Sequence, residues 1–136
     1  MNSRSSLAAV IGIWCLLILV TPLLVERIPL IAAFLYLFFS PICHQLPERS
    51  FFLFGHQLPV CARCIGIYLG AFSGSFFARK NSPPPWVLVA AVVPMALDGG
   101  TQLVFRESTN VLRFVTGLIA GFVVVFYLYA AIASRK

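Results

Sequence analysis

Long runs of apolar residues are the feature of this sequence that most restricts its fold. Five runs with few charged residues follow one another, over residues 7–25, 28–42, 64–77, 86–105 and 111–133. They lack the alternation of apolar and polar residues that marks a barrel strand, so helices are expected. Only 10% of the residues are charged, whereas a soluble domain carries about 25%. The sequence therefore predicts an integral membrane protein of the all-α class.

The lengths of the runs predict a polytopic helical bundle of about five transmembrane helices. A helix needs about 20 apolar residues to cross a bilayer, and about 17 is the lower limit. Residues 28–42 number only about 15, so we expect a short second span. No small-x-small cleavage site follows the first run, which we therefore interpret as a retained anchor and not a signal peptide. Residues 1–136 then form a single integral membrane domain.

The charged residues between the runs predict how the chain lies in the membrane. Five spans place residues 45–60 and 106–110 on one face, and Glu26-Arg27 and Arg79-Lys80 on the other. The basic residues of the second face favour a cytoplasmic C-terminus, and we expect the cell membrane of a prokaryote. The net charge is +6, but the basic residues form no single patch. We therefore expect a lipid bilayer, and not nucleic acid, as the partner.

One segment holds three of the four cysteines and both histidines. It contains Cys43-His44 and the motif Cys61-Ala62-Arg63-Cys64. Zinc binds such side chains in tetrahedral sites, and a Cys-x-x-Cys pair chelates one ion. The sequence therefore predicts a metal site, with zinc as the expected ion, whose ligands are Cys43, His44, Cys61 and Cys64. Because neighbouring side chains point apart, Cys43 and His44 bind one ion only if the helix ends between them, and His56 is a substitute ligand.

Two other functions of the same cysteines stay open. Cys61 and Cys64 are spaced like a redox dithiol, and Arg63 between them favours the thiolate. Small membrane oxidoreductases of the vitamin K epoxide reductase type pass electrons between such a pair and a quinone. Alternatively, the cysteines only staple two helices, through a disulfide or a structural ion, in a structural or assembly subunit.

A second polar group interrupts the fourth run and begins the fifth. Its members line one helical stripe or surround one helix N-terminus: Asp98, Gln102, Arg106, Asn110 and Arg113. An acidic residue within a span is costly and marks a functional site, so we expect catalytic roles for Asp98 and Arg113. We expect Gln102, Arg106 and Asn110 to form a wall that binds an anionic ligand. The alternative is a structural ion pair of Asp98 with Arg106 or Arg113.

The same residues carry a resemblance to a known family. The matching stretches run from Cys43-His44-Gln45 through Cys61-Ala62-Arg63-Cys64, and from Asp98-Gly99 through Arg113. They resemble the small predicted membrane proteins grouped as domain of unknown function 2085, over about residues 40–122. The resemblance implies a multi-pass membrane protein and supplies no activity. The expected function therefore rests on the residues: a zinc-binding membrane protein that binds or acts on a small or lipid-phosphate ligand.

Overall fold

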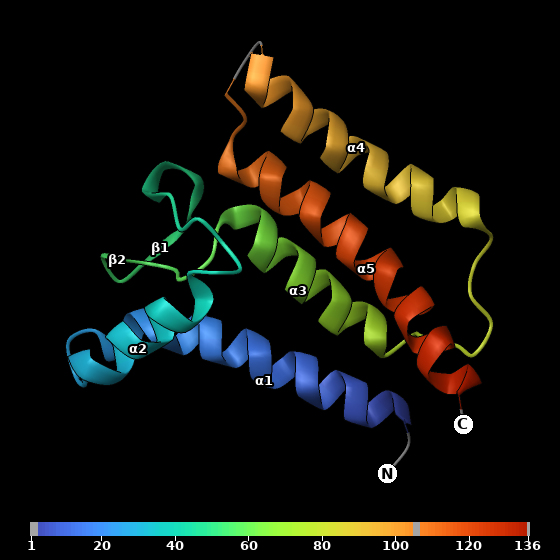
Figure 1. The fold of residues 1–136 in the computed structure, drawn as a ribbon, viewed down its shortest axis with the longest axis horizontal. Coiled ribbons are helices and arrows are strands. Elements are labelled where there is room, and N and C mark those ends of the chain that lie inside the picture. Colours follow the sequence, from blue (N-terminus) through green and yellow to red (C-terminus); the bar gives the residue numbers. More distant parts are fainter. Residues whose placement is uncertain (1–2, 105–106, 136) are drawn as a thin grey trace.

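Helices make up most of the structure, a computed structural model that describes residues 3–104 and 107–135 (Figure 1). They are α1 (Ser3–Leu24), α2 (Pro29–Phe39), α3 (Ala62–Ser75), α4 (Pro85–Val104) and α5 (Asn110–Ser134). Between α2 and α3 lie a 3-10 turn (Pro47–Arg49) and an antiparallel pair of two-residue strands, β1 (Phe52–Leu53) and β2 (His56–Gln57). The chain is thus mostly helical, as the apolar runs predict.

Three of the described helices, α1, α4 and α5, are long and apolar enough to cross a membrane. α2 has 11 residues and α3 has 14. At 1.5 Å per residue they measure about 17 and 21 Å, against a hydrocarbon core of about 30 Å. α2 ends early because Pro41, just after its C-cap Ser40, supplies no backbone N–H for a further helical turn. The predicted bundle of five full spans is therefore not confirmed.

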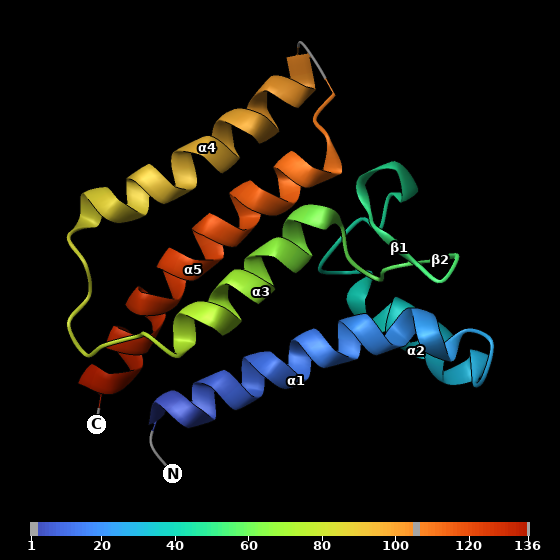
Figure 2. The ribbon, with the colours of Figure 1, turned by 180° about the vertical axis from the view of Figure 1, so that it is seen from behind.

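The turn between α1 and α2 lies at the cysteine end of the molecule. Glu26 Oε1, in that turn, is 3.3 Å from His56 Nε2 of β2. We expected a second spanning helix to separate Glu26-Arg27 from the cysteines, on the opposite face of the membrane. The contact between Glu26 and His56 shows that this expectation is wrong. α2 is too short to carry the chain across, and it folds back beside α1. The start of α1 and the end of α5 lie together at the far end (Figures 1 and 2).

α3 and α5 pack at backbone distance because glycines line their contact. A Cβ atom added at Gly70 of α3 would lie 2.1 Å from the Leu118 carbonyl oxygen, and one at Gly121 of α5 would lie 2.0 Å from that of Ile67. The spacing of four residues between successive glycines is a small-xxx-small pattern, which allows helices in membranes to approach closely. This contact fixes the first turn of α3 beside the first turn of α5.

The hydrophobic core lies where the α1–α2 hairpin meets the start of α3. Ile18, Phe39 and Val60 are fully buried, and Cys43 belongs to the same cluster. Trp14 of α1 lies edge-on to Phe39, with 5.2 Å between ring centroids. Burial of these large side chains therefore determines where Cys43 leaves the end of α2.

Candidate metal centre and its adjoining pocket

Two cysteines lie at the start of α3. Cys61 is the N-cap residue, with φ −70° and ψ 164°, and Cys64 is the third residue of the helix. Side chains at these two positions meet over the first turn, as they do in a capping box. The Cys-x-x-Cys spacing therefore brings the two Sγ atoms to 3.4 Å from each other.

The third cysteine reaches the same place from the end of α2, and Gln45 holds it there. The Gln45 side-chain amide donates to the carbonyl oxygens of Tyr36 and Pro59, both at 2.8 Å. Gln45 also has a φ of 52°, a left-handed conformation that is uncommon outside glycine. The chain thus turns back after Cys43, and the backbone N–H of Cys61 donates to Cys43 Sγ at 3.1 Å.

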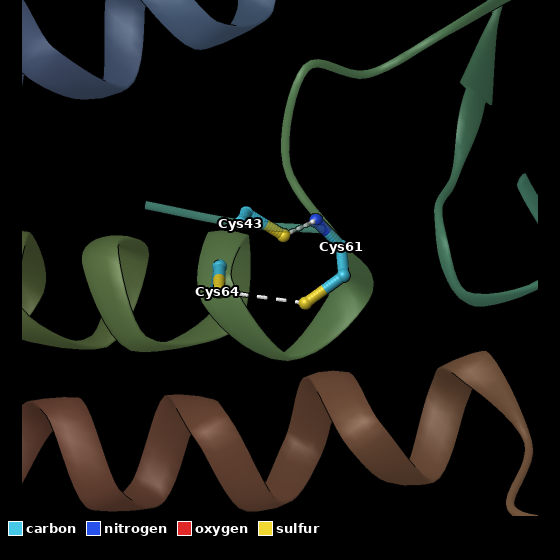
Figure 3. A group of neighbouring side chains, drawn as sticks. All are labelled: Cys43, Cys61 and Cys64. Carbon is cyan, nitrogen blue, oxygen red and sulfur yellow. Dashed lines mark hydrogen bonds between the residues drawn. The ribbon is translucent and has the colours of Figure 1, made fainter. Parts of the chain in front are cut away.

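The three sulfur atoms form one compact cluster (Figure 3). The Sγ atoms of Cys43, Cys61 and Cys64 lie within 4.8 Å of one another, and all three residues are free thiols. Around a tetrahedral zinc ion with bonds of about 2.3 Å, sulfur atoms lie about 3.8 Å apart, so the cluster is close to the size that one ion requires. Hydrogen bonds from the Cys61 and Cys64 thiols hold the pKa of the Cys43 thiol well below its usual value. They favour the thiolate form of Cys43.

Neither histidine belongs to the sulfur cluster. Cys43 is buried, whereas the next residue, His44, is exposed and lies outside the group of clustered ligand atoms. The imidazole of His56 instead lies 3.3 Å from Glu26. This geometry brings three of the four predicted metal ligands together, so the role of His44 as a ligand stays a prediction.

The polar residues of α4 form a hydrogen-bonded chain that leads to α3 and α5. The Asp98 carboxylate oxygen Oδ2 accepts from Arg63 Nη2 at 2.7 Å and from Gln102 Nε2 at 2.9 Å. The Asp98 side chain is only 3% exposed. Gln102 Oε1 accepts in turn from Arg113 Nη2 at 3.2 Å. The ion pair of Asp98 that the structure describes is therefore with Arg63, which lies between the two cysteines. The alternative pair with Arg113 is not found among the described residues, and Arg106 lies outside them.

The start of α5 is hydrogen-bonded to the loop that follows Cys43. Asn110 Nδ2 donates to the Ser50 carbonyl at 3.2 Å, and Arg113 Nη1 donates to the Glu48 carbonyl at 3.5 Å. The two polar groups of the sequence therefore meet at one end of the molecule, as we expected. Arg106, which we placed in the same wall, lies outside the described residues.

A pocket of about 320 Å³ lies between the sulfur cluster and the polar wall. Its lining includes the three clustered cysteines, Gln102 and three arginines: Arg49, Arg63 and Arg113. Arg49 and Arg63 were not among the predicted wall residues. The first lies in the loop and the second between the two cysteines, and only the fold brings them to the same cavity as Arg113.

The fold and the site define a class of protein: a helical membrane protein with a cluster of three thiols at one end. The chain belongs to the family described as "Predicted membrane protein", domain of unknown function 2085, whose model matches residues 43–127. The resemblance inferred from the motifs is therefore confirmed. The matched region begins at Cys43 and includes the whole candidate site.

Similar proteins occur in two further organisms. An uncharacterised protein of Methanocaldococcus jannaschii is 55% identical over 102 residues, which cover 69% of this chain and 65% of that protein. An uncharacterised protein of Methanothermobacter thermautotrophicus is 48% identical over 89 residues, which cover 61% of this chain and 80% of that protein. The alignment thus spans slightly less than two thirds of the length of the first relative. No solved structure matches the chain significantly.

Gln45 is a further site residue that sequence reasoning missed, because an amide beside a Cys-His pair does not itself suggest metal chemistry. We expect Gln45→Ala to leave the Tyr36 and Pro59 carbonyls without this donor. The free energy of unfolding should fall by about 1–3 kcal/mol, and Cys43 should become more accessible. Thermal unfolding in detergent and the rate of thiol labelling measure the two effects. Glu48→Ala is the control, because Glu48 lies in the same loop and is exposed. If Gln45→Ala and Glu48→Ala unfold at the same temperature, the prediction is contradicted.

Proposed function

We propose that the chain is a metal-binding membrane protein in which Cys43, Cys61 and Cys64 hold one ion, with zinc as the expected ion. The observation that carries the proposal is the convergence of three free thiols, from two separate segments, within 4.8 Å. Thiolates are preferred ligands of zinc, and zinc with three protein ligands keeps a fourth position for water or substrate. That arrangement is typical of catalytic zinc sites, whereas a fourth protein ligand is typical of structural ones.

The pocket beside the cluster supports a ligand for this fourth position. Its lining combines three cysteine residues with three arginine residues, so a small anion or the phosphate of a lipid suits it. In this proposal Asp98 positions Arg63 through their 2.7 Å contact. We further propose that the protein lies in the cell membrane with the end of α5 in the cytoplasm. The connection between α3 and α4, which passes close to that end (Figure 1), supports this orientation because it contains the exposed Arg79 and Lys80.

Metal analysis of the full chain, purified in detergent without chelator, tests the proposal. We expect about one zinc ion per chain, because one tetrahedral site uses all three thiols. Changing any one of Cys43, Cys61 and Cys64 to serine should remove most of the metal. Cys15→Ser is the matched control, since Cys15 is a buried free thiol of α1 outside the cluster. Wild-type protein without stoichiometric metal would overturn the proposal.

His44→Ala distinguishes an open zinc site from a closed one. With three sulfur ligands and an exposed His44, we expect the variant to retain its metal. Loss of metal equal to that of the cysteine variants would instead make His44 the fourth ligand, as the sequence predicts. The metal content of the same preparations provides the answer.

A second candidate function, thiol–quinone exchange, is supported by one distance. The Cys61 and Cys64 Sγ atoms are 3.4 Å apart, so a small rotation of either side chain would permit a disulfide bond of about 2.05 Å. In that reaction the two thiols lose two electrons and two protons, and a quinone becomes a hydroquinone. Trapping of the thiols in cells decides between the two functions. A dithiol that never becomes oxidised while quinones are present excludes this exchange.

A further inference from the structure

The guanidinium of Arg113 combines deep burial with neutral partners. Arg113 is only 6% exposed. It donates to Asn110 Oδ1 at 2.8 Å, to Gln102 Oε1 at 3.2 Å and to the Glu48 carbonyl at 3.5 Å. Among residues 3–104 and 107–135, its Nε–H has no acceptor and no carboxylate pairs with it. Burial of a cation without a counter-charge is costly, so this side chain is well suited to bind an anion.

The wall that contains Arg113 has an excess of positive charge. Arg49 and Arg63 line the same pocket, and Asp98 pairs with Arg63. Three arginine residues therefore line the pocket, and one carboxylate, that of Asp98, pairs with one of them. The Nε–H of Arg63 also has no acceptor in the described part of the chain. The volume of about 320 Å³ is large enough for a tetrahedral anion together with part of the molecule that carries it.

We propose that this pocket binds a phosphate group, with Arg113 as the principal binding residue and Arg49 as the second. Guanidinium groups bind phosphate oxygens through paired, charge-assisted hydrogen bonds, and several of them can surround one tetrahedral anion. A lipid headgroup and a dissolved phosphate ester present the same oxygens. The inference rests on the proposed function in one respect, because the ion that the three cysteines would hold would also attract a phosphate oxygen. The contact with Arg113 requires no ion.

Titration calorimetry in phosphate-free buffer and a neutral sugar detergent tests the proposal. One arm uses inorganic phosphate, and the other uses short-chain phosphatidic acid, so the tighter arm identifies the source of the phosphate. We expect Arg113→Met to weaken binding of the tighter probe by about tenfold or more, the loss of one charge-assisted interaction. Arg79→Met is the matched control, because Arg79 is exposed and lies outside the pocket lining. Wild-type protein that binds neither probe overturns the proposal, as does Arg113→Met with wild-type affinity.

Two further variants separate misfolding and metal loss from loss of binding. Arg49 is exposed, so Arg49→Met should fold and should weaken binding about threefold. If Arg113→Met does not fold, wild-type affinity of Arg49→Met overturns the proposal. In Cys64→Ser, which should lack metal, we expect phosphate binding that is weaker but still sensitive to Arg113. If the wild-type chain contains no metal but binds phosphate, the proposed metal site is refuted and this inference is not. If the wild-type chain contains metal but does not bind phosphate, this inference is refuted and the metal site is not.

Discussion

Replacing Gly121 by leucine is expected to prevent α3 and α5 from packing, so that little folded protein is recovered. A Cβ atom at Gly121 would lie 2.0 Å from the Ile67 carbonyl oxygen, a backbone atom that cannot turn aside. The smaller change Gly121→Ala is expected to lower the free energy of unfolding by about 1–3 kcal/mol, the usual cost of overpacking. Recovery from size-exclusion chromatography and thermal unfolding by circular dichroism measure the two effects.

Gly100 on α4 supplies the matched control. A Cβ atom there would meet nothing within 4 Å, and the residue lies within a helix. Gly100→Ala should therefore be neutral or should stabilise the helix by about 0.5–1 kcal/mol. If Gly121→Ala and Gly100→Ala unfold at the same temperature, α3 and α5 do not approach at backbone distance.

Asp98→Ala is expected to cause the second large loss of stability. The change leaves the Arg63 guanidinium without its carboxylate and Gln102 Nε2 without an acceptor. Breaking one side of a buried ion pair costs about 3–5 kcal/mol. The Arg63 side chain keeps 26% of its surface exposed, so solvent should reduce the loss toward the lower value. Thermal unfolding of the purified protein measures the loss.

Two controls show whether the charge pair is responsible. The double variant Arg63→Met with Asp98→Ala removes both charges and should recover part of the lost stability. Glu26→Ala removes the exposed partner of His56, whose pair has side-chain exposures of 80% and 30%, and it should cost less than about 1 kcal/mol. An Asp98→Ala protein that is no less stable than Glu26→Ala would show that the buried pair contributes little.

The positions of the helices could be predicted because polar residues and prolines interrupt the apolar runs. α4 and α5 begin and end within one residue of their predicted runs. The path of the second run could not be predicted from its apolar composition. The run extends over residues 28–42, but its helix ends at Phe39, just before Ser40-Pro41. A shorter helix cannot cross the membrane, so the chain returns to the end from which it came.

The candidate site was predictable where its geometry is local. Cys61 and Cys64 meet within one helical turn, and their spacing reveals this directly. The partner of Asp98 was not predictable, because the rotation of α4 against α3 selects Arg63. The hydrogen bonds of Gln45 depend in the same way on two segments that only the folded chain brings together.

The contact between α3 and α5 divides the proposed metal centre into two mechanically different halves. Cys61, Cys64 and Arg113 belong to helices whose backbones touch, so these side chains keep their relative positions. Cys43 comes from a hairpin that is joined to them through side-chain packing and the amide of Gln45. In the proposed metal-bound form, one ion would link the α1–α2 hairpin to α3, because it would bind Cys43 as well as Cys61 and Cys64. Metal occupancy would therefore determine how firmly the first 40 or so residues are attached to the rest of the protein.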